Sequence, residues 1–298
     1  MPSSCKIFDK DCLSFLESYK GREVDLTFLD PPFNQGKDYS CFDDKQSHED
    51  YWSFISSVLK EVHRISKDGA GIYFMQREKN TQFVLEALEA AGWRLHNLII
   101  WKKMTSAVPC INKFSKSYQV IAYATKGKRP ATFNKLRISP PIPANYKHER
   151  DGGIYITDVW DDIRELTAGY FASPEALRND DNSRFHKQQA PIALLLRIIL
   201  SSTKVDDLVL DPFAGTGTTL VTALQLNRDS IGVEIDPNNV SCIKDRTSQI
   251  KVEDNISKLI NYYCYSDDIE DICGFNLSDI EKELSSKVVF ANKELAFG

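Results

Sequence analysis

The sequence of 298 residues lacks several patterns that would assign it to a protein class at once. Its seven cysteines include no C-x-x-C pair, and their odd number argues against a disulfide framework as well as against a zinc site. His63, His96 and His148 have no metal-ligand spacing. Neither G-x-G-x-x-G nor G-x-x-x-x-G-K-[ST] occurs, so two common nucleotide-binding patterns are absent. We therefore predict no metal site and no disulfide.

Long apolar stretches are also missing. The most apolar run, residues 192–200, is interrupted by Arg197 and has about half the length of a membrane-spanning helix. The first residues show no basic start followed by an apolar stretch and a small-residue cleavage site. The 42% of hydrophobic residues still suffices for a sizeable core. We expect a soluble, globular protein of the cytoplasm with no membrane contact.

Charge is unevenly distributed along a chain whose net charge is −5. Residues 102–150 hold eleven Lys and Arg but only one acid, Glu149, whereas residues 251–298 hold five Lys and ten Asp and Glu. A basic segment mixed with aromatic residues suits contact with phosphate groups, and the acidic segment is most simply interpreted as a solvated surface. The distribution predicts a nucleic-acid partner that the overall charge would hide.

Apolar periodicity predicts strands alternating with helices, the pattern of a doubly wound, mostly parallel α/β sheet. Seven strands are expected, at about residues 6–8, 24–29, 71–75, 98–101, 118–124, 208–211 and 230–234. Prolines and glycines interrupt the pattern between residues 126 and 184, which indicates a loop-rich insertion. We divide the chain into residues 1–125 (first half of the sheet domain), 126–185 (insertion), 186–250 (second half) and 251–298 (acidic C-terminal extension).

Two short segments contain the residues that indicate chemistry. Asp30-Pro31-Pro32-Phe33 follows a buried strand, which the prolines end by removing backbone donors, so an acid stands at the carboxyl end of the strand. The segment from Asp211 to Thr218 joins a strand to a helix, and its glycines would let a ligand approach the helix amides. Glu234 ends the next strand, where an acid commonly accepts hydrogen bonds from ribose hydroxyls. The pattern predicts a nucleotide-type ligand.

These segments resemble motifs of the amino-group DNA methyltransferases that use S-adenosylmethionine. Asp30-Pro31-Pro32-Phe33 is similar to their D/N/S-P-P-Y/F/W catalytic motif, and Phe213-x-Gly215-x-Gly217 is similar to their F-x-G-x-G cofactor motif. The catalytic motif comes first in this chain, with the insertion between the two motifs, which is the order of the β group of that family. The resemblance covers about residues 6–250.

Weaker matches extend the resemblance. Asp11 in Lys10-Asp11-Cys12 resembles the acid of a G-D-C turn that faces the cofactor adenine, and residues 158–160 resemble a D-V-W element. Residues 186–191 resemble H-P-T-Q-K-P, although Lys187 replaces the proline and Ala190 replaces the lysine. A cofactor contact of that lysine side chain therefore does not transfer to this sequence.

The resemblance implies a Rossmann-like methyltransferase sheet in circularly permuted order, with a target-recognition role for the insertion. If Asp211 ends the first strand of such a sheet and Asp30 the fourth, the two strands lie side by side and cofactor and acceptor share one crevice. The Asp30 carboxylate and the Pro31 carbonyl would accept the two N–H groups of an exocyclic amine, which aims its lone pair at the methyl group. Phe33 would stack on a base flipped out of the duplex.

The predicted site residues fall into three groups. The catalytic residues are Asp30, Pro31, Pro32 and Phe33. The cofactor-binding residues are Asp11, Asp211, Phe213, Ala214, Gly215, Thr216, Gly217, Thr218, Glu234 and Gln189. The nucleic-acid contacts are Asn34, Lys37, Lys113, Lys116, Lys128, Arg129, Lys135 and Arg137.

The activity implied by the resemblance is site-specific methylation of the N6 amine of adenine in double-stranded DNA, with S-adenosylmethionine as cofactor. Asp30 favours adenine because the cytosine enzymes of the family more often carry serine there, and cytosine N4 is the alternative. The alternative from another functional class is a regulatory subunit that binds the cofactor and DNA but has no catalytic activity. RNA remains open as an acceptor, whereas enzymes acting on protein glutamine resemble Asn-Pro-Pro-Tyr. A homodimer and a cognate restriction endonuclease acting on the same site also remain open.

Overall fold

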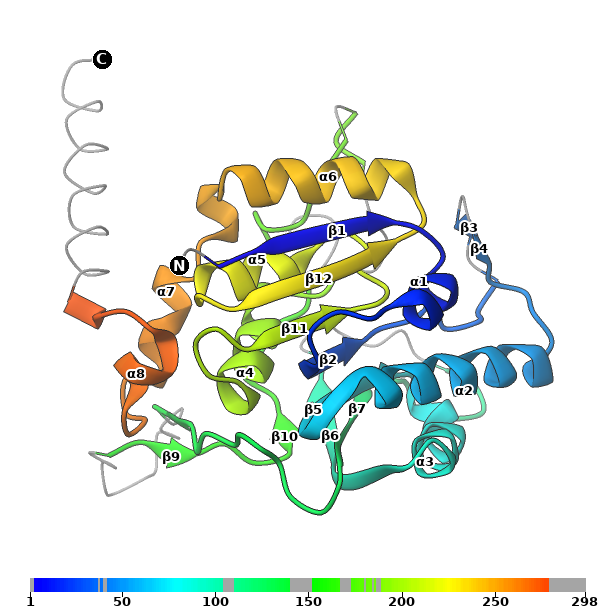
Figure 1. Cartoon of the computed structure of the whole chain (residues 1–298), viewed down its shortest axis with the longest axis horizontal. Coiled ribbons are helices and arrows are strands. Elements are labelled where there is room, and N and C mark those ends of the chain that lie inside the picture. Colours follow the sequence, from blue (N-terminus) through cyan, green and yellow to red (C-terminus); the bar gives the residue numbers. More distant parts are fainter. Residues whose placement is uncertain are drawn as a thin grey trace.

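The structure is a computed structural model that describes residues 3–36, 38–39, 42–103, 110–139, 152–166, 173–179, 181–183, 185 and 189–278. Its centre is an eight-stranded sheet in the order β1-β12-β11-β2-β5-β7-β6-β10 (Figure 1). The strands are β1 (Cys5–Asp9), β2 (Val24–Leu29), β5 (Ser66–Gln76), β6 (Trp93–Lys102), β7 (Tyr118–Lys126), β10 (Val159–Trp160), β11 (Leu208–Asp211) and β12 (Asp229–Glu234). All pairs are parallel except that β7 is antiparallel to both β5 and β6.

Helices cover both faces of the sheet (Figure 1). On one face lie α1 (Cys12–Ser18), α2 (His48–Ile65) and α3 (Thr81–Ala90), and on the other lie α4 (Ile192–Ser202), α5 (Thr218–Gln225) and α6 (Pro237–Ser248). Side chains of a strand alternate between the faces, so Ile72 and Phe74 of β5 join the core beneath α2, while Tyr73 and Met75 join the core beneath α4. The sheet is therefore buried on both sides, as the apolar strands predict.

All seven predicted strands are present, and the doubly wound fold class is confirmed. The prediction missed an eighth strand, β10, which comes from the insertion and pairs with β6 through Val159 and Ile100. Two residues give too little periodicity to be recognised in a sequence. The insertion also contains a short antiparallel pair, β8 (Arg137–Ile138) and β9 (Ile154–Tyr155). Another pair, β3 (Asp38–Tyr39) and β4 (Phe42–Asp43), precedes α2.

The C-terminal extension was interpreted as a solvated surface, and for its described part this is wrong. Residues 252–273 form the short helices η3 (Val252–Asp254), α7 (Ser257–Ile260), η4 (Asn261–Tyr263) and α8 (Ile269–Cys273). Ile256, Ile260 and Tyr263 are buried in the same core as α4. The buried Arg228 guanidinium donates to the Ile272 and Cys273 carbonyls and fastens α8 to the sheet domain. Charge counting missed these apolar positions, and the four domain boundaries themselves stay a prediction.

The strand directions give the sheet two distinct edges. We call the edge at which β1, β12, β11, β2, β5 and β6 end the carboxyl edge, and the other the amino edge. Since β7 runs against its neighbours, Val120 near its start pairs with Gln76 at the end of β5, and Thr125 pairs with Gly71. Residues that follow β7 therefore leave from the amino edge.

Among the described residues, no helix is long and apolar enough to cross a bilayer.

Candidate functional site

The glycine-rich turn joins β11 to α5 at the carboxyl edge. Gly215 (φ +53°) and Gly217 (φ +80°) have the left-handed backbone conformation that favours glycine. The Gly217 amide donates to the Ala214 carbonyl at 2.7 Å, and a Cβ atom at position 217 would lie 2.7 Å from Cγ1 of Ile243. Both the conformation of the turn and its packing on α6 thus require glycine at position 217.

Asp211 stabilises this turn from inside the protein. Its side chain is 3% exposed and accepts hydrogen bonds from the Phe213 amide (3.1 Å) and the Thr219 hydroxyl (2.5 Å). Burial raises the pKa of Asp211 to about 7, assisted by the charge of Glu234 and opposed by the two hydrogen bonds. The Phe213 ring packs edge-on against Phe54 of α2, with 6.2 Å between centroids. Asp211 therefore stabilises the turn, and its predicted contact with the cofactor stays a prediction.

A raised pKa links Asp211 to the pH dependence of stability. Between the ordinary pKa of 3.8 and about 7, the folded protein holds a proton that the unfolded chain has released. This contribution to stability is complete below the unfolded pKa and is lost as the pH rises through about 7. We expect the melting temperature of Asp211→Asn, relative to wild type, to increase from about pH 5 to about pH 8. Circular dichroism melts test this, with the exposed Asp68→Asn as control; an offset that does not vary with pH would contradict it.

Two further predicted acids stand at neighbouring strand ends. Glu234 ends β12, and its carboxylate accepts the amides of Gly215 (2.7 Å), Ile235 (3.0 Å) and Asp236 (2.9 Å). Burial raises the pKa of Glu234, while these hydrogen bonds lower it. Asp11 follows β1 and caps α1 by accepting the Ser14 amide at 2.9 Å. Because β1 and β12 are paired, the two acids leave neighbouring strands at the carboxyl edge, and Glu234 contacts the glycine turn. A ribose contact of Glu234 would add to the bonds that it already accepts, and it stays a prediction.

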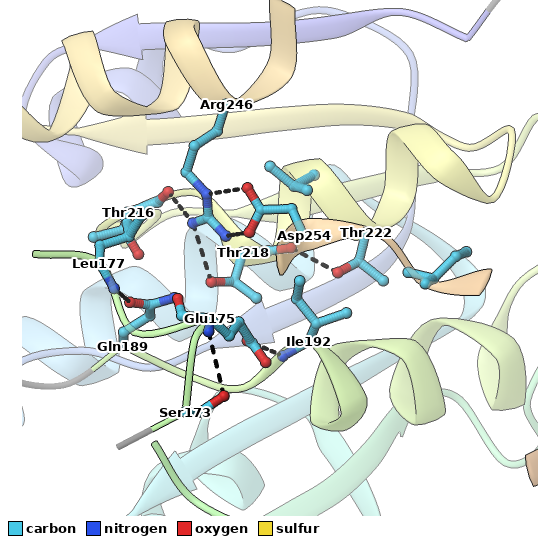
Figure 2. A network of polar contacts seen from close by, with 12 residues as sticks. Ser173, Glu175, Leu177, Gln189, Ile192, Thr216, Thr218, Thr222, Arg246 and Asp254 are labelled. Carbon is cyan, nitrogen blue, oxygen red and sulfur yellow. Dashed lines mark hydrogen bonds and ion pairs between the residues drawn. The ribbon is translucent and has the colours of Figure 1, made fainter. Parts of the chain in front are cut away.

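A buried ion pair supports the far side of the turn. Figure 2 shows the Arg246 guanidinium of α6 between Asp254 (2.7 Å) and the Thr216 carbonyl (2.6 Å). Arg246 also donates to the Thr218 hydroxyl at 3.4 Å. The hydroxyl groups of Thr216 and Thr218 belong to side chains that are almost completely buried. These two residues thus help to hold the turn, and their predicted cofactor contacts stay a prediction.

Gln189 fastens part of the insertion beside the turn. Its side-chain carbonyl accepts the Leu177 amide (3.0 Å), and its side-chain amide donates to the Glu175 carbonyl (2.9 Å) (Figure 2). The Glu175 carboxylate accepts the Ile192 amide at the start of α4 at 2.6 Å, and burial raises its pKa to about 7. The predicted role of Gln189 in cofactor binding stays a prediction. His186, Lys187 and Gln188 lie outside the described residues.

The Asp-Pro-Pro-Phe segment begins directly after β2, which pairs with β11 through Leu26 and Val209. Asp30 and the glycine turn therefore leave neighbouring strands at the same edge. Pro31 is buried and Phe33 is only 3% exposed, as part of the core that also contains Trp101. A base can stack on Phe33 only after side chains that cover its ring have moved. The next residue, Asn34 (φ +50°), donates its side-chain amide to the Gln46 carbonyl at 2.9 Å.

Tyr51 and Gln76, which sequence reasoning missed, hold this segment in place. The Tyr51 hydroxyl donates to the Pro32 carbonyl at 2.8 Å and accepts from the Gln76 side-chain amide at 2.9 Å. Both side chains are buried. Tyr51 lies in the first turn of α2 and Gln76 ends β5, so the sequence offered only one signal: Gln76 is a polar residue at the carboxyl end of a strand. Lys103 is likewise a polar residue at the carboxyl end of a strand, because it directly follows β6.

The predicted nucleic-acid contacts divide between the two edges. Lys113 and Lys116 lie between β6 and β7 at the carboxyl edge, where Lys116 forms an ion pair with Glu78 of η1 (Glu78–Asn80). In the same loop, the side chains of Ile111 and Phe114 are 100% and 98% exposed. This edge therefore combines cations and exposed apolar side chains with the Asp-Pro-Pro-Phe segment.

The other predicted contacts are not brought to this edge. Lys128 and Arg129 follow β7 at the amino edge, where the Ala131 amide donates to the Gly69 carbonyl near the start of β5. Lys135 is next to Asn134, which contacts the C-terminal end of α4. Arg137 donates to Tyr155 at 2.6 Å in the β8–β9 pair. The antiparallel direction of β7 carries these four residues away from the carboxyl edge, and their contact with nucleic acid stays a prediction. Lys37 lies outside the described residues.

Comparisons with known proteins agree with this arrangement. A family model described as DNA methylase, for N6 and N4 methyltransferases, matches residues 24–245. Type II methyltransferase M.BamHI of Bacillus amyloliquefaciens is 30% identical over 271 residues, 86% of this chain and 59% of that protein. DNA adenine methyltransferase YhdJ of Escherichia coli (strain K12) is 29% identical over 248 residues, 77% of this chain and 78% of that protein.

Solved structures share the fold. A complex of M1.HpyAVI with SAM superposes with a TM-score of 0.57 at 20% identity, covering 82% of this chain and all of that one. PvuII DNA methyltransferase (cytosine-N4-specific) gives a TM-score of 0.60 at 17% identity, covering 93% of this chain and 95% of that one. Together with the permuted motif order, the family match over most of the chain shows that the protein belongs to the β group of the N6-adenine/N4-cytosine DNA methyltransferases.

Proposed function

We propose that the protein transfers a methyl group to the N6 amine of adenine in double-stranded DNA. The methyl donor is S-adenosylmethionine, which supplies an electrophilic methyl group on a sulfonium centre. The observation that carries the proposal is the pairing of β2 with β11, because it puts the Asp-Pro-Pro-Phe segment and the glycine turn on adjacent strand ends. Cofactor and amine can then meet at one crevice.

The residues at the carboxyl edge suit this cofactor. The left-handed glycine turn leaves no side chain at Gly215 or Gly217, and its amides lie at the start of α5. Glu234 and Asp11 add carboxylates that can accept hydrogen bonds from a nucleoside. These groups would hold the nucleoside part of the cofactor, with Asp211, Arg246 and Asp254 supporting the turn from within.

Asp30 and Pro31 would orient the amine. The lone pair of an exocyclic amine is delocalised into the base, so the amine is a poor nucleophile until acceptors on both N–H bonds favour a pyramidal nitrogen. A carboxylate and a carbonyl on a rigid turn provide such acceptors without reorganisation during the reaction. Pro32 stiffens the turn and Tyr51 fixes its carbonyl. Phe33 would hold the flipped base once the ring is uncovered.

Adenine is favoured over cytosine by Asp30 and by the similarity to an adenine methyltransferase. The test is methylation of mixed genomic DNA by the purified protein with labelled cofactor, followed by digestion to nucleosides and mass analysis. We expect N6-methyladenine. N4-methylcytosine without N6-methyladenine would overturn the choice of base, and cofactor binding without any transfer would support the regulatory subunit. RNA is tested in parallel. A homodimer, a cognate endonuclease and a cytoplasmic location stay predictions.

Tyr51→Phe is expected to slow methyl transfer by about tenfold, because loss of one hydroxyl leaves both the Pro32 carbonyl and the Gln76 amide without that partner. The unmatched buried groups should also lower the free energy of unfolding by about 1–3 kcal/mol. Steady-state kinetics and urea denaturation measure the two effects. Tyr19→Phe is the matched control, since the Tyr19 hydroxyl also donates to a backbone carbonyl, that of Arg22, but at a partly exposed position. Equal rates for the two variants would contradict the proposed role of Tyr51.

A further inference from the structure

The loop that joins β6 to β7 presents two apolar side chains to solvent. Within its described residues 110–117, Ile111 is 100% exposed and Phe114 is 98% exposed. The next most exposed large apolar side chain of the described chain, Val252, is 77% exposed. Almost the whole surface of Ile111 and Phe114 thus faces water, and both contribute little to the packing of the folded protein. Covering them would stabilise a complex with a partner.

The base of this loop is fixed, and it lies beside the Asp-Pro-Pro-Phe segment. The Lys103 amide donates to the Ser117 carbonyl at 2.6 Å, directly beyond the last pair of β6 and β7. Lys116 forms an ion pair with Glu78, which follows Gln76 at the end of β5 by two residues. Since β5 is paired with β2, the loop is attached next to the strand that leads to the Asp-Pro-Pro-Phe segment.

The sheet order gives this segment two different neighbours. On one side of β2 lies β11 with the glycine turn, and on the other lie β5, β7 and β6 with the loop. The cofactor would occupy the first side, so the second side is left for the rest of the nucleic acid.

The charge of the loop indicates the chemistry of its partner. Lys113 lies between Ile111 and Phe114 in the sequence, and residues 102–148 contain no Asp or Glu. The cores of protein–protein interfaces are depleted in lysine, so a second protein chain suits this surface poorly. Duplex DNA suits it well, because its phosphates attract cations and its base steps accept apolar side chains as wedges.

We propose that the Phe114 ring enters the base stack of duplex DNA at the position that the target base leaves. Lys113 would contact a neighbouring phosphate, and Ile111 would add apolar contact beside the ring. This inference rests on the proposed function, because a base that moves to the Asp-Pro-Pro-Phe segment opens a gap in the duplex. A phenyl ring in that gap stacks on the adjacent bases and offsets part of the cost of unstacking.

Phe114→Ala is expected to weaken binding of duplex DNA at least about fivefold, the lower end of what stacking on one base contributes. The probe is a duplex with the sequence that the wild-type protein methylates, and fluorescence anisotropy with S-adenosylhomocysteine present measures its binding. Phe114→Trp should bind like wild type because an indole also stacks. The melting temperature of Phe114→Ala should stay unchanged, since the ring is exposed.

Phe133→Ala is the control for this experiment. Phe133 belongs to the same basic stretch and is 53% exposed, but it follows β7, which ends at the amino edge. Equal DNA affinities of Phe114→Ala and Phe133→Ala would overturn the proposal, as would a loss that Phe114→Trp does not reduce. A change of oligomeric state in Phe114→Ala, measured by sedimentation, would also overturn it by assigning the ring to a contact between two copies of the chain.

A second probe needs neither methyl transfer nor a known target sequence. A duplex of mixed sequence with one abasic site already contains a gap in its base stack. We expect the wild-type protein to bind it more tightly than the same duplex without the abasic site, and Phe114→Ala to lose this preference. An equal preference in both proteins, or none in wild type, would refute insertion of the ring. If the wild-type protein methylates no nucleic acid, the proposed function fails, whereas this comparison still decides whether Phe114 enters the stack.

Discussion

Asp30→Ala is expected to lower the rate of methyl transfer to DNA by at least about 100- to 1,000-fold, the usual cost of removing one preorganised group that stabilises a transition state. Asp30 stands at the end of β2, beside the strand that leads into the glycine turn. Its carboxylate would accept one N–H of the target amine. Without it the nitrogen lone pair stays delocalised into the base, and no other described residue of the Asp-Pro-Pro-Phe turn offers a carboxylate.

Cofactor binding should survive this substitution, because the glycine turn, Glu234 and Asp11 do not depend on Asp30. Calorimetric titration with S-adenosylmethionine measures that binding, and transfer of labelled methyl groups to DNA measures the rate. Asp68→Ala is the control: Asp68 is an exposed acid on the neighbouring strand, whereas Asp30 is partly buried, and Asp68 lies near the start of β5, on the amino edge. Turnover by Asp30→Ala at the rate of the control would refute the assigned role.

Gly215→Val is expected to weaken binding of S-adenosylmethionine by at least about tenfold. Gly215 has φ +53°, and a β-branched residue in this region costs at least about 1–2 kcal/mol, close to a factor of ten in an equilibrium constant. The Gly215 amide donates to Glu234 at 2.7 Å, so a shift of the turn also disturbs the acid at the end of β12. Methyl transfer would fall with the occupancy of the site.

Gly127→Val is the control that separates a loss of cofactor affinity from the loss of stability that a glycine-to-valine substitution itself causes. Gly127 has φ +91°, and a Cβ atom there would meet nothing within 4 Å. Gly127 follows β7 at the amino edge, so a valine there causes similar backbone strain far from the glycine-rich turn. We expect the two variants to lose similar thermal stability while only Gly215→Val loses cofactor affinity in the titration. Equal affinities would show that the turn does not contact the cofactor.

Local patterns predicted that each of the two motifs follows a buried strand, and the resemblance to the methyltransferases implied that these two strands are neighbours. Val24, Leu26 and Phe28 form an apolar run that ends at two prolines, and Leu208 to Leu210 form another that ends at a glycine turn. Local patterns of this kind are strong because each strand is buried on both faces. The structure confirms that β2 and β11 are neighbours and that each motif leaves from the carboxyl edge.

The edge of the sheet at which each basic residue lies could not be predicted from local patterns. Lys113 and Lys128 belong to one basic stretch of sequence, but they lie at opposite edges of the sheet. Periodicity predicts that residues 118–124 form a strand, but a strand has the same period in either direction. The direction of β7 follows from its pairing with β5 and β6, which is a long-range property. The positive charge of residues 102–150 therefore did not reveal which of these cations share an edge with Asp30.

Buried polar contacts were equally invisible in the sequence. Tyr51 and Gln76 meet at Pro32 from a helix and a strand, and Arg246 reaches Thr216 from α6. Each pair is distant in sequence and leaves no periodic trace. The apolar residues of the C-terminal extension were hidden in a different way, because the acidic side chains between them dominated its composition.

The sequence by itself determined the fold class, the seven longer strands and the positions of the two motifs at strand ends, because these depend on local patterns of apolar residues, prolines and glycines. The tertiary structure alone decided which cations share an edge with Asp30 and which side chains fix the Asp-Pro-Pro-Phe turn. Strand direction, burial and charge coupling depend on residues far apart in the chain, and only folding brings them together.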